Sequence, residues 1–232
     1  MSSFKPESNY IEAFYYLLWQ REEIYTEHLR INIPNTLFIR NSIPKVWNFT
    51  GKDGRILRKS EKCITSDHIV KAFGANKDKY DIVAVLFVCH ENERVEIKYM
   101  NYSELRSATG FLSQSKFKFP KQGFCVLEQY LIPSQEYESL IEVIWNSNFI
   151  LFNKKTNLYK FHDENVDPVQ KCMTFDAPGH VVTCDKMPDC CVTDEIKNIC
   201  ENIYTHINKI SFGSIRMSQM MLYFKFYNGK LF

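Results

Sequence analysis

The chain has 232 residues, of which 45% are hydrophobic and 24% charged, and its 29 basic and 27 acidic side chains give a net charge of +2. These are the proportions of an ordinary globular protein, and they exclude a disordered tail protein, a collagen-like fibre and a disulfide scaffold. The small net charge argues against a dedicated duplex-binding domain, an acidic substrate and a membrane surface.

The start of the chain lacks the basic, apolar and small-residue regions of a signal peptide. The longest apolar run, Ile82–Cys89, is far shorter than the roughly 20 residues that cross a bilayer. We therefore expect a cytoplasmic protein, with a nuclear location left open, whose eight cysteines are reduced thiols. The many aromatic residues, 18 Phe, 13 Tyr and 3 Trp, fit the codon usage of an AT-rich genome.

The first expected element is a long helix over Asn9–Ile31, which Ser8 or Asn9 can cap and which Asn32-Ile33-Pro34 ends. Its run Phe14–Trp19 is apolar on every side, whereas a surface helix needs only one apolar stripe. Residues 1–31 are therefore expected to form an arm or docked helix that meets a protein partner or a second copy of the chain. The predicted partner-binding side chains are aromatic: Tyr10, Phe14, Tyr15, Tyr16, Trp19 and Tyr25.

The next part of the chain is rich in β-branched and aromatic residues. Ser66 or Asp67 can cap a short helix that ends at Gly74. The remaining expected elements are strands, at Leu37–Arg40, Ile56–Leu57, Asp81–Cys89 (central, buried on both faces), Arg94–Met100 and Phe124–Ile132. The stretch Ser113–Gly123 resembles a linker and marks a candidate internal boundary.

Two helices and several hairpins are expected in the second half. The helices cover Tyr137–Asn146 and an amphipathic segment from Thr193 to Ile210. The hairpins pair strands at Phe149–Phe152 with Leu158–Phe161, and at Lys171–Phe175 with His180–Cys184. A final strand, Met217–Phe226, leads into an Asn228-Gly229 turn. Because little sequence follows this turn, we expect either a very short edge strand or the front part of a longer chain.

Strands that follow one another as hairpins, with helices at the start, middle and end, are typical of the α+β class with a mainly antiparallel sheet. Apart from the first helix and the candidate boundary at 113–123, residues 32–232 are expected to form a single domain.

Cysteine and histidine side chains gather in the second half, where weak metal-ligand candidates are Cys172, His180, Cys184 and Cys190. The paired C-x-x-C or H-x-x-x-H spacing of structural zinc sites is absent, so we expect no metal and no cofactor. A thiol-dependent or zinc hydrolase remains an open alternative.

A second alternative is a module that binds single-stranded nucleic acid, because cations and aromatic rings alternate near residue 117 and such sites combine stacking with phosphate attraction. The candidate residues are Arg55, Arg58, Lys116, Phe117, Lys118 and Phe119. No catalytic motif stands out, so the favoured hypothesis is a non-catalytic protein-protein interaction or scaffold subunit of a larger intracellular assembly. A cytoskeletal or ciliary setting fits this hypothesis, and neither a membrane nor nucleic acid is an expected partner.

Overall fold

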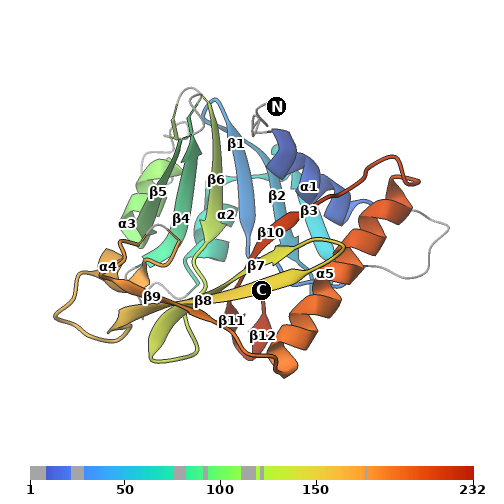
Figure 1. Ribbon diagram of the computed structural model, residues 1–232. Coiled ribbons are helices and arrows are strands. Elements are labelled where there is room, and N and C mark those ends of the chain that lie inside the picture. Colours follow the sequence, from blue (N-terminus) through green and yellow to red (C-terminus); the bar gives the residue numbers. More distant parts are fainter. Residues whose placement is uncertain are drawn as a thin grey trace. The chain divides into compact units, whose positions relative to one another are not determined.

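Helices and antiparallel strands both occur in the computed structural model (Figure 1), which confirms the α+β class. The structure describes residues 9–21, 29–75, 82–90, 94–110, 119–120, 123–175 and 177–232. It divides into unit 1, made of Met1–Trp19 and Ile33–Tyr130, and unit 2, made of Gln20–Asn32 and Leu131–Phe232. This division follows Tyr130 rather than residues 113–123, most of which lie outside the described part.

Unit 1 contains a six-stranded antiparallel sheet in the order β3-β2-β1-β6-β4-β5. Its strands are β1 (Thr36–Arg40), β2 (Ile43–Thr50), β3 (Ile56–Ser60), β4 (Ile82–Cys89), β5 (Val95–Asn101) and β6 (Phe124–Gln129). The strand expected at 81–89 is indeed internal, because β4 pairs with β5 on one side and β6 on the other. β6, the last of these strands in the sequence, lies between β1 and β4.

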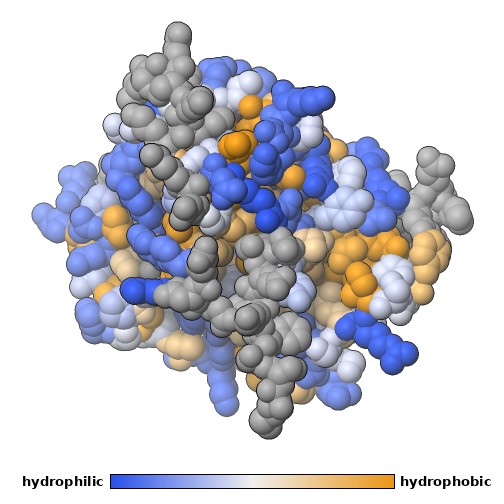
Figure 2. Space-filling model, turned by 90° about the horizontal axis from the view of Figure 1, so that it is seen from above, coloured by the Kyte–Doolittle hydropathy of each residue, from blue (hydrophilic) through white to orange (hydrophobic). Residues whose placement is uncertain are grey.

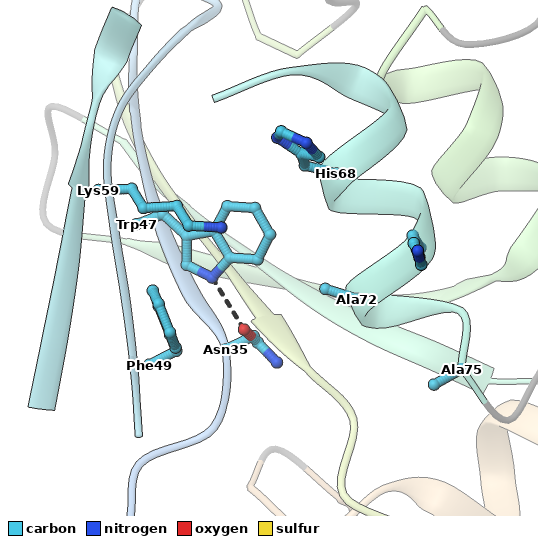
Figure 3. Close-up of a pocket in the computed structure, with 8 residues that line it drawn as sticks. Asn35, Trp47, Phe49, Lys59, His68, Ala72 and Ala75 are labelled. Carbon is cyan, nitrogen blue, oxygen red and sulfur yellow. Dashed lines mark hydrogen bonds between the residues drawn. The ribbon is translucent and has the colours of Figure 1, made fainter. Parts of the chain in front are cut away.

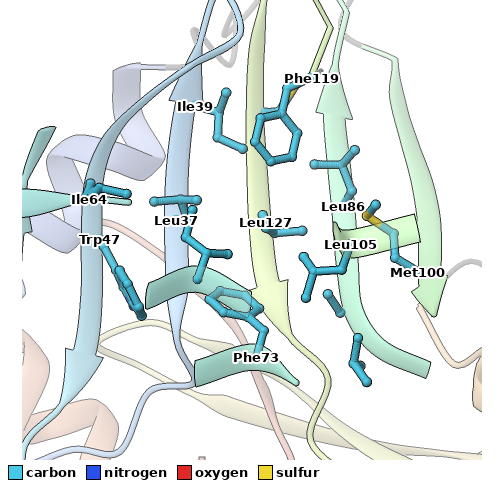
Figure 4. Packing of buried hydrophobic residues seen from close by; sticks show 14 residues of the cluster. Leu37, Ile39, Trp47, Ile64, Phe73, Leu86, Met100, Leu105, Phe119 and Leu127 are labelled. Atoms are coloured by element: carbon cyan, nitrogen blue, oxygen red, sulfur yellow. The ribbon is translucent and has the colours of Figure 1, made fainter. Parts of the chain in front are cut away.

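One face of this sheet packs against short helices: η1 (Glu61–Cys63), α2 (Ser66–Phe73) and α3 (Tyr102–Ala108). Thr65 caps α2, since its side chain accepts a hydrogen bond from the backbone N–H of His68. Asn101 and Glu104 form a capping box that begins α3, a helix the sequence analysis missed. Leu37, Leu86 and Leu127 of the sheet meet Phe73 of α2 and Leu105 of α3 in the main core of the unit (Figure 4).

The opposite face of the same sheet carries α1 (Asn9–Trp19). The expected long helix to Ile31 is wrong, because Gln20, Arg21 and Leu29–Ile31 are not helical, and residues 22–28 lie outside the described part. Short helices gain most of their stability from packing an apolar face. The continuous apolar run of this segment ends at Trp19, the last residue of α1.

Unit 2 contains a four-stranded antiparallel sheet in the order β10-β7-β8-β9 and a two-stranded hairpin. The four strands are β7 (Tyr137–Trp145), β8 (Ile150–Lys160), β9 (Val182–Lys186) and β10 (Met220–Phe224). The hairpin joins β11 (Phe226–Tyr227) and β12 (Lys230–Leu231) through Asn228 and Gly229, both at positive φ, which confirms the Asn-Gly turn.

Three expectations for unit 2 are wrong. Residues 137–146 form β7 rather than a helix, with Leu140 and Ile141 both buried although neighbouring side chains of a strand point to opposite faces. The expected hairpin over 149–161 is the single strand β8, which pairs with β7 and β9. Residues 171–175 do not form a strand, because Asp167 and Pro168 begin the short helix α4 (Pro168–Cys172).

The amphipathic helix expected near the end of the chain is α5 (Cys191–Ile210). Cys190 is its N-cap. Thr193, where the helix was expected to begin, occupies the third helical position and donates to the carbonyl oxygen of Cys190. Its buried stripe of Ile196, Ile203 and Ile207 faces the sheet, where Tyr204 packs against Trp145 with ring centroids 5.1 Å apart.

Candidate interaction surface and binding pocket

Two side chains of α1, Tyr15 and Glu12, hold the helix against the sheet of unit 1. The Tyr15 ring packs edge-on against Phe38 of β1, with centroids 5.2 Å apart. Glu12 accepts hydrogen bonds from Arg40, with Nη2 at 2.8 Å from Oε2. Burial, with a smaller contribution from a nearby negative charge, raises the pKa of the Tyr15 hydroxyl. Tyr15, a predicted partner-binding residue, is therefore part of the packing beneath the helix.

A cation also bridges α1 and β3. The guanidinium of Arg58 lies 5.0 Å from the ring centroid of Tyr16 and 5.2 Å from that of Trp19. Such cation–π contacts contribute roughly 0.5–1 kcal/mol each at exposed sites. Arg58, a predicted nucleic-acid contact, thus helps to hold the helix.

The outer side of α1 remains apolar and open to solvent. Tyr10, Ile11 and Tyr16 are 57%, 46% and 43% exposed, whereas Phe14 and Trp19 are half-buried. Among the described residues of the helix, only Glu12 is charged. We call Tyr10, Ile11 and Tyr16 the α1 surface. Seen from above, hydrophobic residues are interspersed with hydrophilic ones on this face of the molecule (Figure 2). Tyr25 lies outside the described residues.

Of the residues predicted to bind nucleic acid, the structure describes only Arg55, Arg58 and Phe119. Arg55 forms an ion pair with Asp53 in the β2–β3 turn. Phe119 is buried in the core of unit 1, so its ring cannot stack on a base. Lys116, Phe117 and Lys118 lie outside the described residues.

The metal-ligand candidates differ in their surroundings. Cys172 is buried at the end of α4, His180 and Cys184 are exposed, and Cys190 begins α5. Within the ranges that the structure describes, no group of three or more His, Cys, Asp or Glu side chains is placed to hold a metal ion. Hydrogen bonds to the Cys190 sulfur lower the pKa of its thiol, and the backbone N–H of Thr193 makes the largest contribution.

A pocket of about 450 Å³ lies between α2 and the β2–β3 edge of the sheet (Figure 3). We call it the Trp47 pocket. Its lining residues are Asn35, Trp47, Phe49, Lys59, His68, Lys71, Ala72 and Ala75. In Figure 3, Lys59 extends across the ring of Trp47, and His68 and Ala72 face them from α2.

Hydrogen bonds fix the floor of the pocket. The indole Nε1–H of Trp47 donates to Oδ1 of Asn35 at 2.9 Å, and Nδ2 of Asn35 donates to Oε1 of Gln129 at 2.7 Å. The Lys59 ammonium lies 4.5 Å from the centroid of the Trp47 ring and 5.2 Å from that of Phe49. The floor is therefore apolar, because its polar atoms are already bonded, while the rim carries Lys59, His68 and Lys71.

The sequence analysis did not identify this pocket, although part of its signal was present. The Lys52–Arg55 turn fixes the pairing of β2 with β3, and this pairing places Trp47 directly opposite Lys59. Counting outward from the turn finds the aromatic and cationic pair. The position of α2 depends on tertiary packing and has no comparable local signal.

No protein-family model matches the chain, and no curated protein matches it. None of the described helices is both long enough and apolar enough to cross a membrane.

Proposed function

We propose that this chain is a non-catalytic structural subunit that assembles with copies of itself through the α1 surface. The observation that carries the proposal is the exposure of three large apolar side chains, Tyr10, Ile11 and Tyr16, on a helix that is held to the sheet by the packing of Tyr15 against Phe38. Burial of a large apolar side chain contributes roughly 1.5–3 kcal/mol, so association that covers these residues is favourable.

The chemistry of the α1 surface favours a second copy as its partner. The three residues of the surface are uncharged, so two copies related by a twofold axis would place apolar groups together, with the Arg58 guanidinium 5.0 Å from the centroid of the Tyr16 ring in each copy. Tyr10 and Tyr16 also have hydroxyl groups that can remain at the wet rim of such a contact.

The size of the contact sets the expected strength. A stable interface buries about 800 Å² on each partner, and a helix as short as α1 offers less. We therefore expect weak association, with a dissociation constant on the order of micromolar or above, unless further residues of the chain join the contact.

Sedimentation velocity of the whole chain, over roughly 1–200 μM to span that range, tests the proposal. We expect a concentration-dependent dimer that the combined change Tyr10→Ser and Ile11→Ser weakens at least about tenfold, or about 1.4 kcal/mol. Leu158→Ser is the matched control, because Leu158 is 51% exposed in unit 2 and is expected to leave the dimer unchanged. A monomer at every concentration, or a dimer that the α1 change does not weaken, would refute the proposal.

A further inference from the structure

The Trp47 pocket combines an apolar floor with a positively charged rim. Trp47 and Phe49 provide aromatic surface, and Ala72 adds a small apolar side chain from α2. None of the side chains that line the pocket, among the described residues, is a carboxylate. Its electrostatic character therefore comes from Lys59 and Lys71.

The two lysines are available to a ligand. In the described part of the chain, neither Lys59 nor Lys71 forms an ion pair with a carboxylate. The ammonium of Lys59 instead rests over the rings of Trp47 and Phe49. An ammonium held in this way can turn toward an anion without breaking a salt bridge, because cation–π attraction is weak at accessible sites.

The volume of the pocket limits the ligand to a small molecule. Sites for small molecules and cofactors are typically about 300–1,000 Å³ and mostly apolar, with a few polar groups that orient the ligand. At about 450 Å³ the Trp47 pocket lies within this range. The indole N–H of Trp47 donates to Asn35, and the Asn35 amide nitrogen donates to Gln129, so these hydrogen bonds are made within the protein and the floor presents mainly apolar surface to a ligand.

We infer that the Trp47 pocket binds a small anion whose charged group is attached to a flat apolar body, as in a nucleoside monophosphate or an aromatic carboxylate. When Lys59 turns from the rings of Trp47 and Phe49 toward the anionic group, the flat body takes the place of its ammonium beside Phe49 and Ala72, and Lys71 adds a second positive charge. This site is separate from the α1 surface and does not depend on self-association.

Isothermal titration calorimetry of the whole chain tests this inference with three probes: AMP, benzoate and inorganic phosphate. We expect AMP, benzoate or both to bind, and inorganic phosphate to bind at least about tenfold more weakly, because it lacks the apolar body. Whichever of AMP and benzoate binds more tightly identifies the anionic group that the pocket accepts.

Three lysine variants locate the binding. The combined change Lys59→Gln and Lys71→Gln is expected to weaken binding at least about tenfold. Lys59→Arg keeps the positive charge over the rings and is expected to retain binding. It therefore tests the role of the charge even if the double glutamine variant does not fold. Lys52→Gln, at an exposed lysine in the β2–β3 turn outside the pocket, is the matched control and is expected to change nothing.

Three results would overturn the inference. The first is that neither AMP nor benzoate gives heat of binding at millimolar concentration. The second is that Lys52→Gln weakens binding as much as the pocket variants do. The third is that inorganic phosphate binds as tightly as the other probes. Sedimentation velocity of the same samples measures their oligomeric state, so a failure to bind the probes can be told apart from a failure to self-associate.

Discussion

Asn157, within β8, connects the sheet of unit 2 to the short helix α4. Its side chain is 1% exposed. Nδ2 donates to the carbonyl oxygens of Gln170 at 2.7 Å and Met173 at 2.9 Å, and Oδ1 accepts from the backbone N–H of Tyr159 at 2.8 Å. Because Gln170 lies in α4 and Met173 follows its last residue, one amide fixes the helix to the strand.

Asn157→Ala removes all three hydrogen bonds and leaves two carbonyl oxygens and one N–H without this partner. A typical intramolecular hydrogen bond contributes a net 0.5–1.5 kcal/mol, so we expect the free energy of unfolding of unit 2 to fall by about 2–4 kcal/mol. Asn157→Asp retains an acceptor for Tyr159 but places a carboxylate oxygen against the two carbonyl oxygens. We expect its loss to be at least as large.

Urea unfolding, with hydrogen exchange of α4 and β8 measured by mass spectrometry, checks this expectation. Asn198→Ala is the control, because Asn198 is exposed on α5 and its loss is expected to stay within about 0.5 kcal/mol. If Asn157→Ala unfolds at the same urea concentration as the unchanged protein, and α4 exchanges no faster, the reasoning fails.

Two further changes test local packing and local electrostatics. In Gly74→Ala, the new methyl group would lie 2.7 Å from the carbonyl oxygen of Val70 and would overlap Tyr102, so overpacking is expected to cost about 1–3 kcal/mol of stability in thermal or urea unfolding. Hydrogen bonds at the start of α5 lower the pKa of Cys190, so its thiol remains in the reactive thiolate form at a lower pH than an ordinary thiol does. Its alkylation rate with iodoacetamide, measured residue by residue with mass spectrometry, is therefore expected to inflect below the usual range.

Each of these changes has its own comparison. Gly179→Ala is matched to Gly74→Ala, because a Cβ at Gly179 meets no atom within 4 Å, and equal losses at the two positions would contradict the packing argument. The alkylation profile of Cys184, an exposed thiol on β9, is the reference for Cys190. The electrostatic argument is wrong if the profile of Cys190 inflects at the same pH as that of Cys184 or at a higher one.

Local signals predicted those elements whose sequence allows one interpretation. The continuous apolar run before residue 90 identified β4, and the alternation after it identified β5. Gly74 marked the end of α2, and Asn228-Gly229 marked the last turn. The isoleucine stripe of α5 is similarly unambiguous, because its spacing matches a helix over several turns.

The error at β7 has a physical cause. Leu140, Ile141 and Ile144 fit one side of a helix as well as they fit a strand whose two faces are both covered in part. The choice is made by the strands that pair with this segment, β8, which follows it directly, and β10, which is distant in sequence. At α1, in contrast, the sequence identified the apolar run but not the residue at which the helix ends, since the extent of a docked helix depends on the surface beneath it.

The candidate sites divide in the same way. The aromatic character of α1 is visible in the sequence, yet only the structure separates half-buried Tyr15, packed against Phe38, from exposed Tyr10. The Trp47 pocket requires α2 to lie opposite the β2–β3 hairpin, and that arrangement arises from packing of Phe73 with residues of several strands.

The position of β6 has a consequence for synthesis of the chain. The earlier strands of unit 1 can form only two separate pieces, β1–β2–β3 and β4–β5, until residues 124–129 leave the ribosome and pair with both. Until then β1 and β4 each have an open edge, and open edges pair readily with strands of other chains. Because pairing between distant segments is slow, codon usage just before Phe124 should affect how much of the newly made protein aggregates.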